Sequence, residues 1–378
     1  MRASSDKWWL LPLGILTASS LVAVGIVVLG PSFAGRSSDD EVAQRADRQP
    51  TVTSEPAADC SGALATDYAC YQQRYQDLVS GSSVEAAFAE LKDEYANNDF
   101  VSSNCHQLTH VIGRAAAELY GDIPTTYGYG DDLCTAGYYH GAMEAFVAKI
   151  GADKLLDEAN TLCADLGEHQ KHSFYHYDCA HGLGHGFMGV YENDLFESLR
   201  ACDALTDGWE KDPCYAGVFM QNVMAEDDPS HPSKHLKADR PLHPCIDVQA
   251  RYKTPCYRIQ TSYALRTQGY DFAKVFELCA TEAEDGFRPA CYQGLGGYAS
   301  MQSIQQNTTD VAQNGTIGTL CMLGEDYEAR SNCVVGAAKQ FILHYHGDMQ
   351  AKALCESFDA DLRAVCLQGG EEFYGSFL

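Results

Sequence analysis

Positive charge is scarce in this chain. Lys and Arg number 26 against 52 Asp and Glu residues, so the formal net charge is −26. A phosphate backbone would repel such a protein, which excludes a general nucleic-acid-binding role and argues against anionic membrane surfaces as partners. Familiar catalytic motifs are missing as well: the sequence has no G-x-S-x-G turn, no Walker A loop and no H-E-x-x-H helix.

Closely spaced cysteines are also absent. No two cysteines are separated by two residues, the spacing typical of zinc ribbons, thioredoxin-like sites and c-type haem attachment. Cysteine itself is abundant, with 16 residues in a chain of 378. An even number of cysteines without metal-binding spacing favours disulfides in an oxidising compartment. With 46% hydrophobic residues, the chain can also bury a sizeable core.

The amino terminus predicts export. Residues 8–30 carry no charge and follow two basic residues, Arg2 and Lys7. At about 1.5 Å per residue, a helix of this length can cross a hydrocarbon core of about 30 Å. The basic flank predicts that the amino terminus stays inside and that the rest of the chain is exported.

Two alternatives stay open for residues 1–34. The length of the apolar run favours an uncleaved signal anchor, which would make a single-pass cell-membrane protein. The small-x-small sequence at 32–34 instead suits a signal peptide, whose cleavage would give a secreted or periplasmic protein. Polar residues 35–58 are predicted to be a flexible linker to an exported, cysteine-rich domain at 59–378.

The cysteines of this domain fall into recurring pairs. Six pairs are 11, 12 or 16 residues apart, and their first members recur every 34 to 43 residues, the period of helical-hairpin repeats. These pairs are Cys163–Cys179, Cys202–Cys214, Cys245–Cys256, Cys279–Cys291, Cys321–Cys333 and Cys355–Cys366. The connectivity of the four earlier cysteines stays open, and elimination favours Cys60–Cys70 and Cys105–Cys134.

Apolar periodicity predicts helices on both sides of each pair. A segment with helical spacing precedes the first cysteine, as in 271–278, and a second apolar segment follows the second cysteine. Three residues after the second cysteine comes a glycine in six cases, at Gly137, Gly182, Gly217, Gly294, Gly336 and Gly369, whereas Ile259 follows Cys256 at this position. Because glycine costs about 1 kcal/mol relative to alanine in a helix, its recurrence predicts that two helices approach closely there.

We therefore predict an all-α domain of hairpins, each with a helix A and a helix B, tied by a disulfide between the end of A and the start of B. The hairpins would form an α/α solenoid or close into a toroid. This arrangement resembles that of secreted Sel1-like helical repeats, which are also stapled by cysteines, although the cysteine spacing and the glycine pattern differ.

Histidine is concentrated in one region, with eight of the 13 residues between positions 106 and 185. Three pairs of metal-binding residue types are four residues apart, a spacing that places both side chains on one helix face. Each pair lies in the first turns of a predicted helix B, so neighbouring hairpins would bring the pairs together. We predict a metal site formed by His106, His110, His140, Glu144, His181 and His185.

These H-x-x-x-H and H-x-x-x-E motifs resemble the ligand set of hemerythrin-like di-iron bundles, in which they also lie on neighbouring helices. The resemblance implies a dinuclear iron site, although no H-x-x-x-x-D partner is present. Zinc and copper also bind imidazole, so iron, copper and zinc all stay open. A bis-imidazole haem and a purely structural role of the histidines are further alternatives.

Other candidate residues carry weaker predictions. His169, His172 and His176 fall between Cys163 and Cys179 and are predicted to lie in a solvated loop. Met220 and Met224 align with His140 and Glu144, and core packing is the expected role of methionines at helical spacing. Glu372 occupies the repeat position of His140 and could approach the histidines only if the stack closes on itself.

Two functions are compatible with these patterns. The first is an exported metalloprotein acting as a metal-dependent oxidoreductase or in dioxygen handling, with a metal-dependent hydrolase as second choice. Its partner would be a small molecule. The second is a non-enzymatic scaffold that binds a protein or peptide on the concave face of the repeats. Because a fold does not determine function, the geometry of the histidines has to decide.

Overall fold

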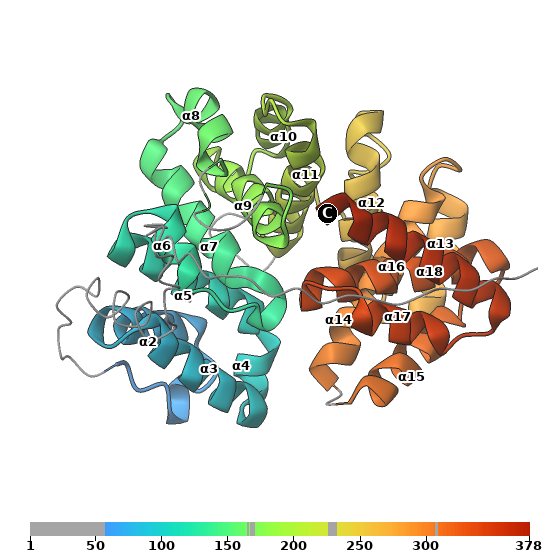
Figure 1. The fold of residues 1–378 in the computed structure, drawn as a ribbon, viewed down its shortest axis with the longest axis horizontal. Coiled ribbons are helices and arrows are strands. Elements are labelled where there is room, and N and C mark those ends of the chain that lie inside the picture. Colours follow the sequence, from blue (N-terminus) through green and yellow to red (C-terminus); the bar gives the residue numbers. More distant parts are fainter. Residues whose placement is uncertain (1–56, 165, 167–170, 226–232, 307–308) are drawn as a thin grey trace, which may run out of the picture. The chain divides into compact units, whose positions relative to one another are not determined.

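The computed structural model describes residues 57–164, 166, 171–225, 233–306 and 309–378. The predicted anchor or signal peptide at 1–34 and nearly all of the linker at 35–58 lie outside these ranges. The described residues form seventeen α-helices and no strand, which confirms the all-α prediction (Figure 1). Among them, no helix combines the length and the apolar character needed to span a membrane.

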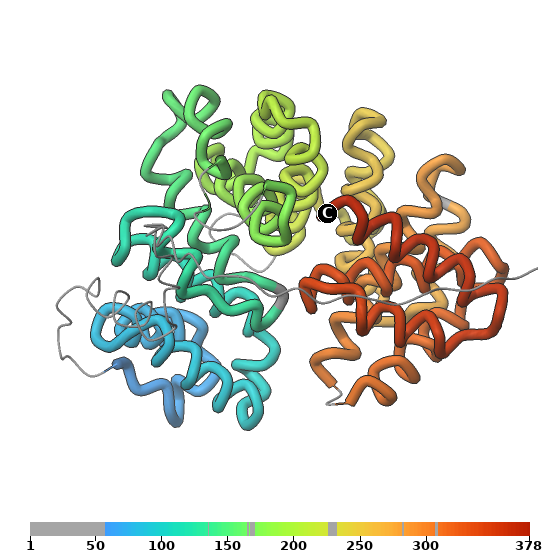
Figure 2. The backbone as a smooth tube through the Cα atoms, in the orientation of Figure 1, coloured from blue at the N-terminus to red at the C-terminus, as the bar shows by residue number. Residues whose placement is uncertain are grey.

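Eight helices form a continuous series in which each helix packs against the next. We keep the name B helices for this series: α5 (Cys105–Tyr120), α7 (Leu133–Ile150), α9 (Phe174–Val190), α11 (Gly208–Met224), α12 (Ala250–Thr267), α14 (Arg288–Gln306), α16 (Tyr327–Tyr345) and α18 (Ala360–Tyr374). Figure 2 follows the chain as it runs through these helices from the blue end to the red end.

The other helices precede or connect the B helices. They are α2 (Tyr68–Gly81), α3 (Val84–Asn97), α4 (Asp99–Ser103), α6 (Ile123–Gly128), α8 (Leu155–Leu162), α10 (Leu195–Asp203), α13 (Phe272–Glu282), α15 (Asp310–Cys321) and α17 (Met349–Glu356). Their starts follow from capping residues: the Asp271 carboxylate, for example, accepts a hydrogen bond from the backbone N–H of Lys274 at 3.2 Å, so α13 begins at Phe272.

All eight predicted cysteine pairs are disulfides, with Cα–Cα distances between 5.4 and 5.8 Å. Most of them tie neighbouring helices as predicted, but three depart from the A-to-B pattern. Cys60, which is bonded to Cys70, precedes α2 and lies in no helix. Cys105–Cys134 joins the starts of two B helices, α5 and α7. The segment before Cys256 has no helix A among its described residues, because 233–249 form turns and bends.

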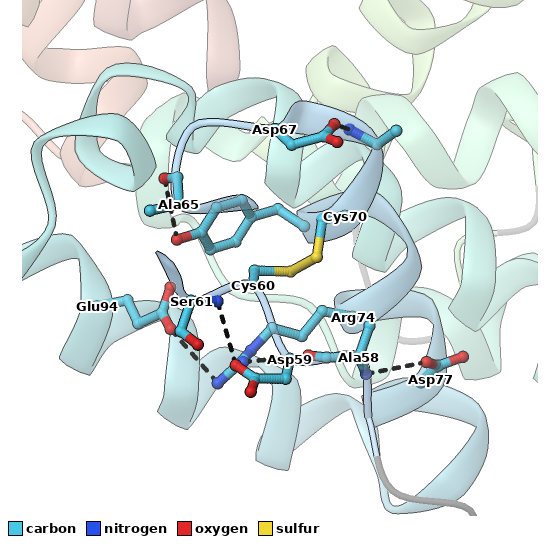
Figure 3. Close-up of a disulfide and its surroundings, with 12 residues drawn as sticks. Ala58, Asp59, Cys60, Ser61, Ala65, Asp67, Cys70, Arg74, Asp77 and Glu94 are labelled. Carbon is cyan, nitrogen blue, oxygen red and sulfur yellow. Dashed lines mark hydrogen bonds and ion pairs between the residues drawn. A yellow bond between two sulfur atoms is a disulfide. The ribbon is translucent and has the colours of Figure 1, made fainter. Parts of the chain in front are cut away.

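The first disulfide fastens the start of the described chain to α2 (Figure 3). Cys60 is bonded to Cys70 in the first turn of this helix. Two further contacts hold the same segment: Arg74 donates a hydrogen bond to the Ala58 carbonyl oxygen at 3.2 Å, and Asp77 accepts one from the Ala58 N–H at 3.2 Å. The disulfide therefore adds to polar contacts that already fix this end of the domain.

The recurring glycines lie where B helices cross, as predicted. A β-carbon at Gly217 would collide with the His181 carbonyl oxygen, and one at Gly336 would collide with the Gln293 carbonyl oxygen. Gly369 and Gly182 instead face the side chains of the neighbouring helix. Glycine is therefore required for helix packing at these crossings, which explains why the sequence tolerates its cost in a helix.

The carboxy-terminal end of the chain packs against α9 and α11 (Figure 1). The ring of Phe377 stacks on Phe174 at the start of α9, with 4.2 Å between the ring centroids. The indole N–H of Trp209 in α11 donates a hydrogen bond to the Ser376 carbonyl oxygen at 3.2 Å. The last helix thus contacts residues of the first half of the domain as well as its neighbour α16.

Candidate metal centre

The six side chains predicted as metal ligands come together in the structure. They lie in pairs on α5, α7 and α9, three consecutive B helices that pack against one another. We call this group the histidine cluster: His106, His110, His140, Glu144, His181 and His185. Four of its histidines are buried, with 1 to 4% of their surface exposed. Such burial is unusual for histidine and needs a physical reason.

Glycines next to the histidines allow these helices to approach. A β-carbon at Gly141 would collide with the His110 carbonyl oxygen, and one at Gly137 would meet the His106 carbonyl oxygen. The close crossing brings the imidazoles of different helices into contact. Ring centroids are 5.5 Å apart for His110 and His140, and 4.5 Å apart for His140 and His181.

Hydrogen bonds on one side of the cluster assign the tautomers of three imidazoles. Nδ1 of His106 lies 2.7 Å from the Cys134 carbonyl oxygen, which can only accept, so this Nδ1 carries the hydrogen. Nδ1 of His110 likewise donates to Glu144 Oε1 at 2.8 Å, and Nδ1 of His185 donates to Gln221 Oε1 at 2.9 Å. In all three neutral rings, Nε2 is left with a lone pair.

Two of these lone pairs face each other. Nε2 of His106 is 3.1 Å from Nε2 of His110. Because both Nδ1 atoms already donate elsewhere, two neutral rings would have no hydrogen between their Nε2 atoms, so the contact needs either a proton on one of the rings or a metal ion between them. Two nitrogens bonded to one tetrahedral ion at about 2.0–2.1 Å would lie about 3.3–3.4 Å apart. The observed separation is therefore close to that of a chelating pair.

Other nitrogens of the cluster have no hydrogen-bond partner among the described residues. They are Nδ1 of His140, both ring nitrogens of His181 and Nε2 of His185. A buried polar atom without a partner costs free energy, about 1–3 kcal/mol each. Three buried histidines with such atoms in one place therefore destabilise the fold by themselves, whereas the same unpaired nitrogens are suitable metal ligands.

The electrostatic environment lowers the pKa values of four imidazoles, those of His106, His140, His181 and His185, and so favours the neutral form that binds metals. Burial, followed by the charge of His110, lowers the pKa of His106 to about 3 and that of His185 to about 4. Burial and the neighbouring histidines also hold the pKa values of His140 and His181 well below the usual range. At neutral pH these rings are available as ligands.

Glu144 is ionised and is shared between two partners. Burial alone would raise its pKa, but the charges of His110 and Arg114 outweigh burial and lower it. Its Oε2 accepts a hydrogen bond from Arg114 at 2.5 Å, while its Oε1 lies 3.8 Å from Nδ1 of His185. In this position the carboxylate orients the His110 ring, as carboxylates behind metal-binding histidines commonly do.

The donor atoms form three overlapping groups, in each of which all atoms lie within 4.8 Å of one another. The groups are His106, His110 and His140; His140, His181 and His185; and His110, Glu144 and His185. The buried histidine clusters are thus able to hold a metal. The identity of the metal is left open by this arrangement.

The cluster borders two cavities. One of about 1120 Å³ is lined by His110, Glu144 and His185 on one side of the cluster. The other, of about 400 Å³, is lined by His106, His140 and His181. A small molecule could therefore reach the imidazoles from either side without a rearrangement of the helices.

The weaker predictions have mixed outcomes. The prediction of a solvated loop is wrong for His176, because Ser173 caps α9 six residues before Cys179 and His176 lies in the first turn of this helix. His176 is buried, and its Nε2 is hydrogen-bonded to Glu210 at 2.8 Å. His172 is partly exposed, and His169 lies outside the described residues.

The structure also places the other three weaker candidates, Met220, Met224 and Glu372. Met220 and Met224 are only half-buried and line the cavity of about 400 Å³, so they are not simply core residues. Glu372 is exposed and forms no donor group with the cluster among the described residues.

Sequence reasoning missed two supporting residues, Arg114 and Gln221. Arg114 carried a usable signal, because it lies four residues after His110 and hence on the same face of α5. Gln221 carried no such signal, since it contacts His185 only through the packing of α11 on α9.

Neither a protein-family model, nor a curated protein, nor a solved structure matches the chain. The resemblances to Sel1-like repeats and to hemerythrin-like bundles are therefore limited to arrangement and short motifs. The function rests on the chemistry of the cluster itself, and the eight disulfides indicate a protein exported to an oxidising compartment.

Proposed function

We propose that the protein is an exported metalloprotein that holds one or two metal ions in the histidine cluster and acts as an oxidoreductase or in dioxygen handling. The observation that carries this proposal is the approach of Nε2 of His106 and Nε2 of His110 to 3.1 Å, close to the separation of two nitrogens that chelate one ion. The unpartnered nitrogens of His140, His181 and His185 support it.

The overlap of the donor groups supports a site for two ions. His106 and His110 would hold one ion, and His181 and His185 the other, with His140 completing either set. Glu144 would act mainly behind His110 rather than as a direct ligand, since both its oxygens are already engaged. A set of imidazoles suits iron, copper and zinc, and bound iron or copper would supply redox chemistry.

The cavities suggest what reaches the site. Besides the histidines, the cavity of about 400 Å³ is lined by two cationic side chains, Arg258 and Lys339, and by two acidic ones, Asp178 and Asp212. Burial, followed by repulsion from Arg258, lowers the pKa of Lys339 to about 8, so Lys339 is still mostly charged at neutral pH. We propose that small polar molecules enter here, where side chains of both charges line the cavity.

The proposal also includes three features of the fold: the repeats, the closure of their stack and the membrane anchor. We take the hairpins to be repeats of one unit and the contact of Phe377 with Phe174 to close their stack into a ring. We also retain the single-pass membrane anchor at 8–30, which would hold the domain at the outer face of the cell membrane.

Metal analysis of the purified full-length protein tests the proposal. His110 and His185 together belong to all three donor groups, so the double variant His110→Ala/His185→Ala removes a ligand from each. We expect about one or two ions per chain in the wild type and a nearly complete loss in the variant. The matched control is Gln293→Ala, which changes a residue outside the donor groups that lines the cavity of about 400 Å³ on the other side of the cluster.

The identity of the metal then separates the candidate activities. Iron or copper that changes oxidation state reversibly with a reductant and dioxygen would support the redox role, whereas zinc alone would favour hydrolysis. A folded wild type that binds none of these ions after reconstitution would contradict the proposal and leave the non-enzymatic scaffold as the better reading.

A further inference from the structure

A second group of ligand-type residues lies away from the histidine cluster, where three helix ends meet. Asp132 precedes α7, Asp178 lies in the second turn of α9, and His346 ends α16 with a left-handed backbone at φ 48°. We call these three residues the Asp–His corner. It joins the first half of the domain to a helix that comes more than 150 residues later in the sequence.

The three side chains converge on a small volume. One donor atom from each residue lies within 4.8 Å of the other two. Nδ1 of His346 is 3.4 Å from Asp132 Oδ2, and its Nε2 is 3.6 Å from Asp178 Oδ2. Both distances exceed those of an ordinary N–H···O hydrogen bond, which are about 2.7–3.2 Å. An imidazole binds a given ion through only one of its nitrogens, so one of these distances is a separation between two ligand atoms, and it falls in the range of about 3.0–4.2 Å expected for ligands bonded to one ion at about 2.1 Å.

The carboxylates have oxygens that nothing in the described part of the chain satisfies. Oδ1 of Asp132 and Oδ2 of Asp178 are buried and have no hydrogen-bond partner there. The side chain of Asp178 is only 8% exposed. The side chain of Asp132 is 39% exposed, so the cost falls mainly on Asp178: burying this carboxylate without full hydrogen bonding is unfavourable, and the cost falls when a cation binds it.

Aromatic rings surround the corner and hold the imidazole in place. The ring of Phe174 stacks on His346 at 4.8 Å with an angle of 5° between the planes, and Tyr175 meets it edge-on at 5.5 Å. Tyr139 provides a side-chain hydrogen bond to Asp132. An apolar wall with a few oriented polar groups behind the ligands is typical of bound metal ions.

We propose that the Asp–His corner binds a divalent transition-metal ion, with Zn²⁺ as the probe, and that this ion fastens the end of α16 to the starts of α7 and α9. Two carboxylates and one imidazole are ligands that Zn²⁺ accepts readily, with a fourth position for water. One ring nitrogen of His346 would bind the ion, and the other would face the nearer carboxylate. The site shares no residue with the histidine cluster, so it stands whether or not that cluster binds metal.

The test isolates the corner from the cluster. Full-length His110→Ala/His185→Ala, freed of metal, is titrated with Zn²⁺ by calorimetry, and its thermal unfolding is followed with and without Zn²⁺. We expect one Zn²⁺ per chain and an increase in Tm on binding. Adding Asp178→Asn should weaken this binding by more than about 100-fold, because even residues behind the ligands contribute about 10–100-fold.

The stability of the metal-free protein separates a metal site from a simple charge pair. If the corner is a metal site, Asp178→Asn removes a buried charge and leaves the metal-free Tm unchanged or higher, while Zn²⁺ no longer raises it. The matched control is Asp207→Asn, which changes another aspartate beside a histidine, His172, at 3.2 Å. It should retain the Zn²⁺ effect.

Two outcomes would overturn the proposal. One is Zn²⁺ binding that Asp178→Asn does not weaken. The other is a lower metal-free Tm in Asp178→Asn together with no effect of Zn²⁺ on either protein, which would show a structural charge pair. If the double histidine variant does not fold, Asp178→Asn is made in the wild type instead. The metal content should then fall by one ion per chain, because the histidine cluster keeps its metal. An unchanged metal content would then contradict the proposal.

Discussion

The two halves of the B-helix series use the same construction but carry different side chains. In the first half, His181 lies two residues after its cysteine, and His140 and His185 lie six residues after theirs. In the second half, the same two positions hold Arg258 and Ser262 on α12, Gln293 and Gly297 on α14, and Val335 and Lys339 on α16. Disulfides and crossing glycines are common to both halves.

The polar groups of the two halves differ in how they are satisfied. Gln293 has both ends of its amide paired: it donates to Asn332 at 3.2 Å and accepts from Lys339 at 3.2 Å. His181, at the equivalent position, has neither ring nitrogen paired among the described residues. The comparison indicates that the disulfides and the glycines build the scaffold in both halves. The ring nitrogens without hydrogen-bond partners mark the part of the scaffold that is suited to binding a ligand.

Removing one disulfide from each half should have the largest effect on stability. Cys163→Ala/Cys179→Ala and Cys321→Ala/Cys333→Ala should each lower the free energy of unfolding by about 3 kcal/mol, measured by urea denaturation. Only the first pair should also weaken metal binding, because Cys179 lies two residues before His181. Equal loss of metal from both variants would contradict a division between the halves.

Replacing a glycine where two helices cross should have a smaller effect on stability and again tests whether only the first half binds metal. Gly141→Ala and Gly336→Ala each place a methyl group against a carbonyl oxygen of the neighbouring helix. Overpacking of this kind typically costs about 1–3 kcal/mol, so both variants should lose stability in urea. Metal content should fall only in Gly141→Ala, since its helix must move away from His110.

The control for this pair is Gly315→Ala in α15, where a β-carbon would meet no atom within 4 Å. That variant should gain up to about 1 kcal/mol from helix propensity. A Gly336→Ala protein as stable as Gly315→Ala would show that the crossing is not tightly packed.

The carboxylate behind His110 should affect binding rather than folding. Glu144→Gln keeps the shape of the side chain but weakens the hydrogen bond from His110 Nδ1, so metal affinity should fall by about 10–100-fold in a calorimetric titration. Glu372→Gln, an exposed carboxylate in the second half, should leave the affinity unchanged. Complete loss of binding in Glu144→Gln would instead make Glu144 a direct ligand.

Much of this division could be predicted from spacing alone. Fixed intervals between cysteines gave the disulfides, and the interval of four residues placed His106 with His110 and His181 with His185 on single helix faces. The start of α9 was mispredicted because the cap at Ser173 lies far ahead of Cys179, which hid the burial of His176. Local patterns cannot report such long-range consequences of packing.

The Asp–His corner shows the same limit more clearly. Asp132 and Asp178 carry no helical spacing relative to each other, and His346 comes from the far end of the chain. Their meeting accompanies direct packing of α16 against α7 and of His346 against Phe174 at the start of α9. Sequence periodicity describes neighbouring hairpins, whereas the contacts between distant hairpins depend on the rotation accumulated along the whole series.

The pH dependence of the metal-free protein gives the smallest and most specific contrast between the halves. Unfolded His181 titrates near its ordinary pKa of 6.5, whereas burial holds the folded pKa well below it. As pH falls below about 6.5, the unfolded chain therefore binds a proton that the native state refuses, and stability is lost until the folded pKa is reached. His181→Gln should remove up to about 1.4 kcal/mol of this loss per pH unit.

Gln293→Ala, at the equivalent position of α14, has no titrating group to remove and should parallel the wild type in urea denaturation between pH 7 and pH 5. Parallel curves for all three proteins would mean that His181 is not held neutral by burial.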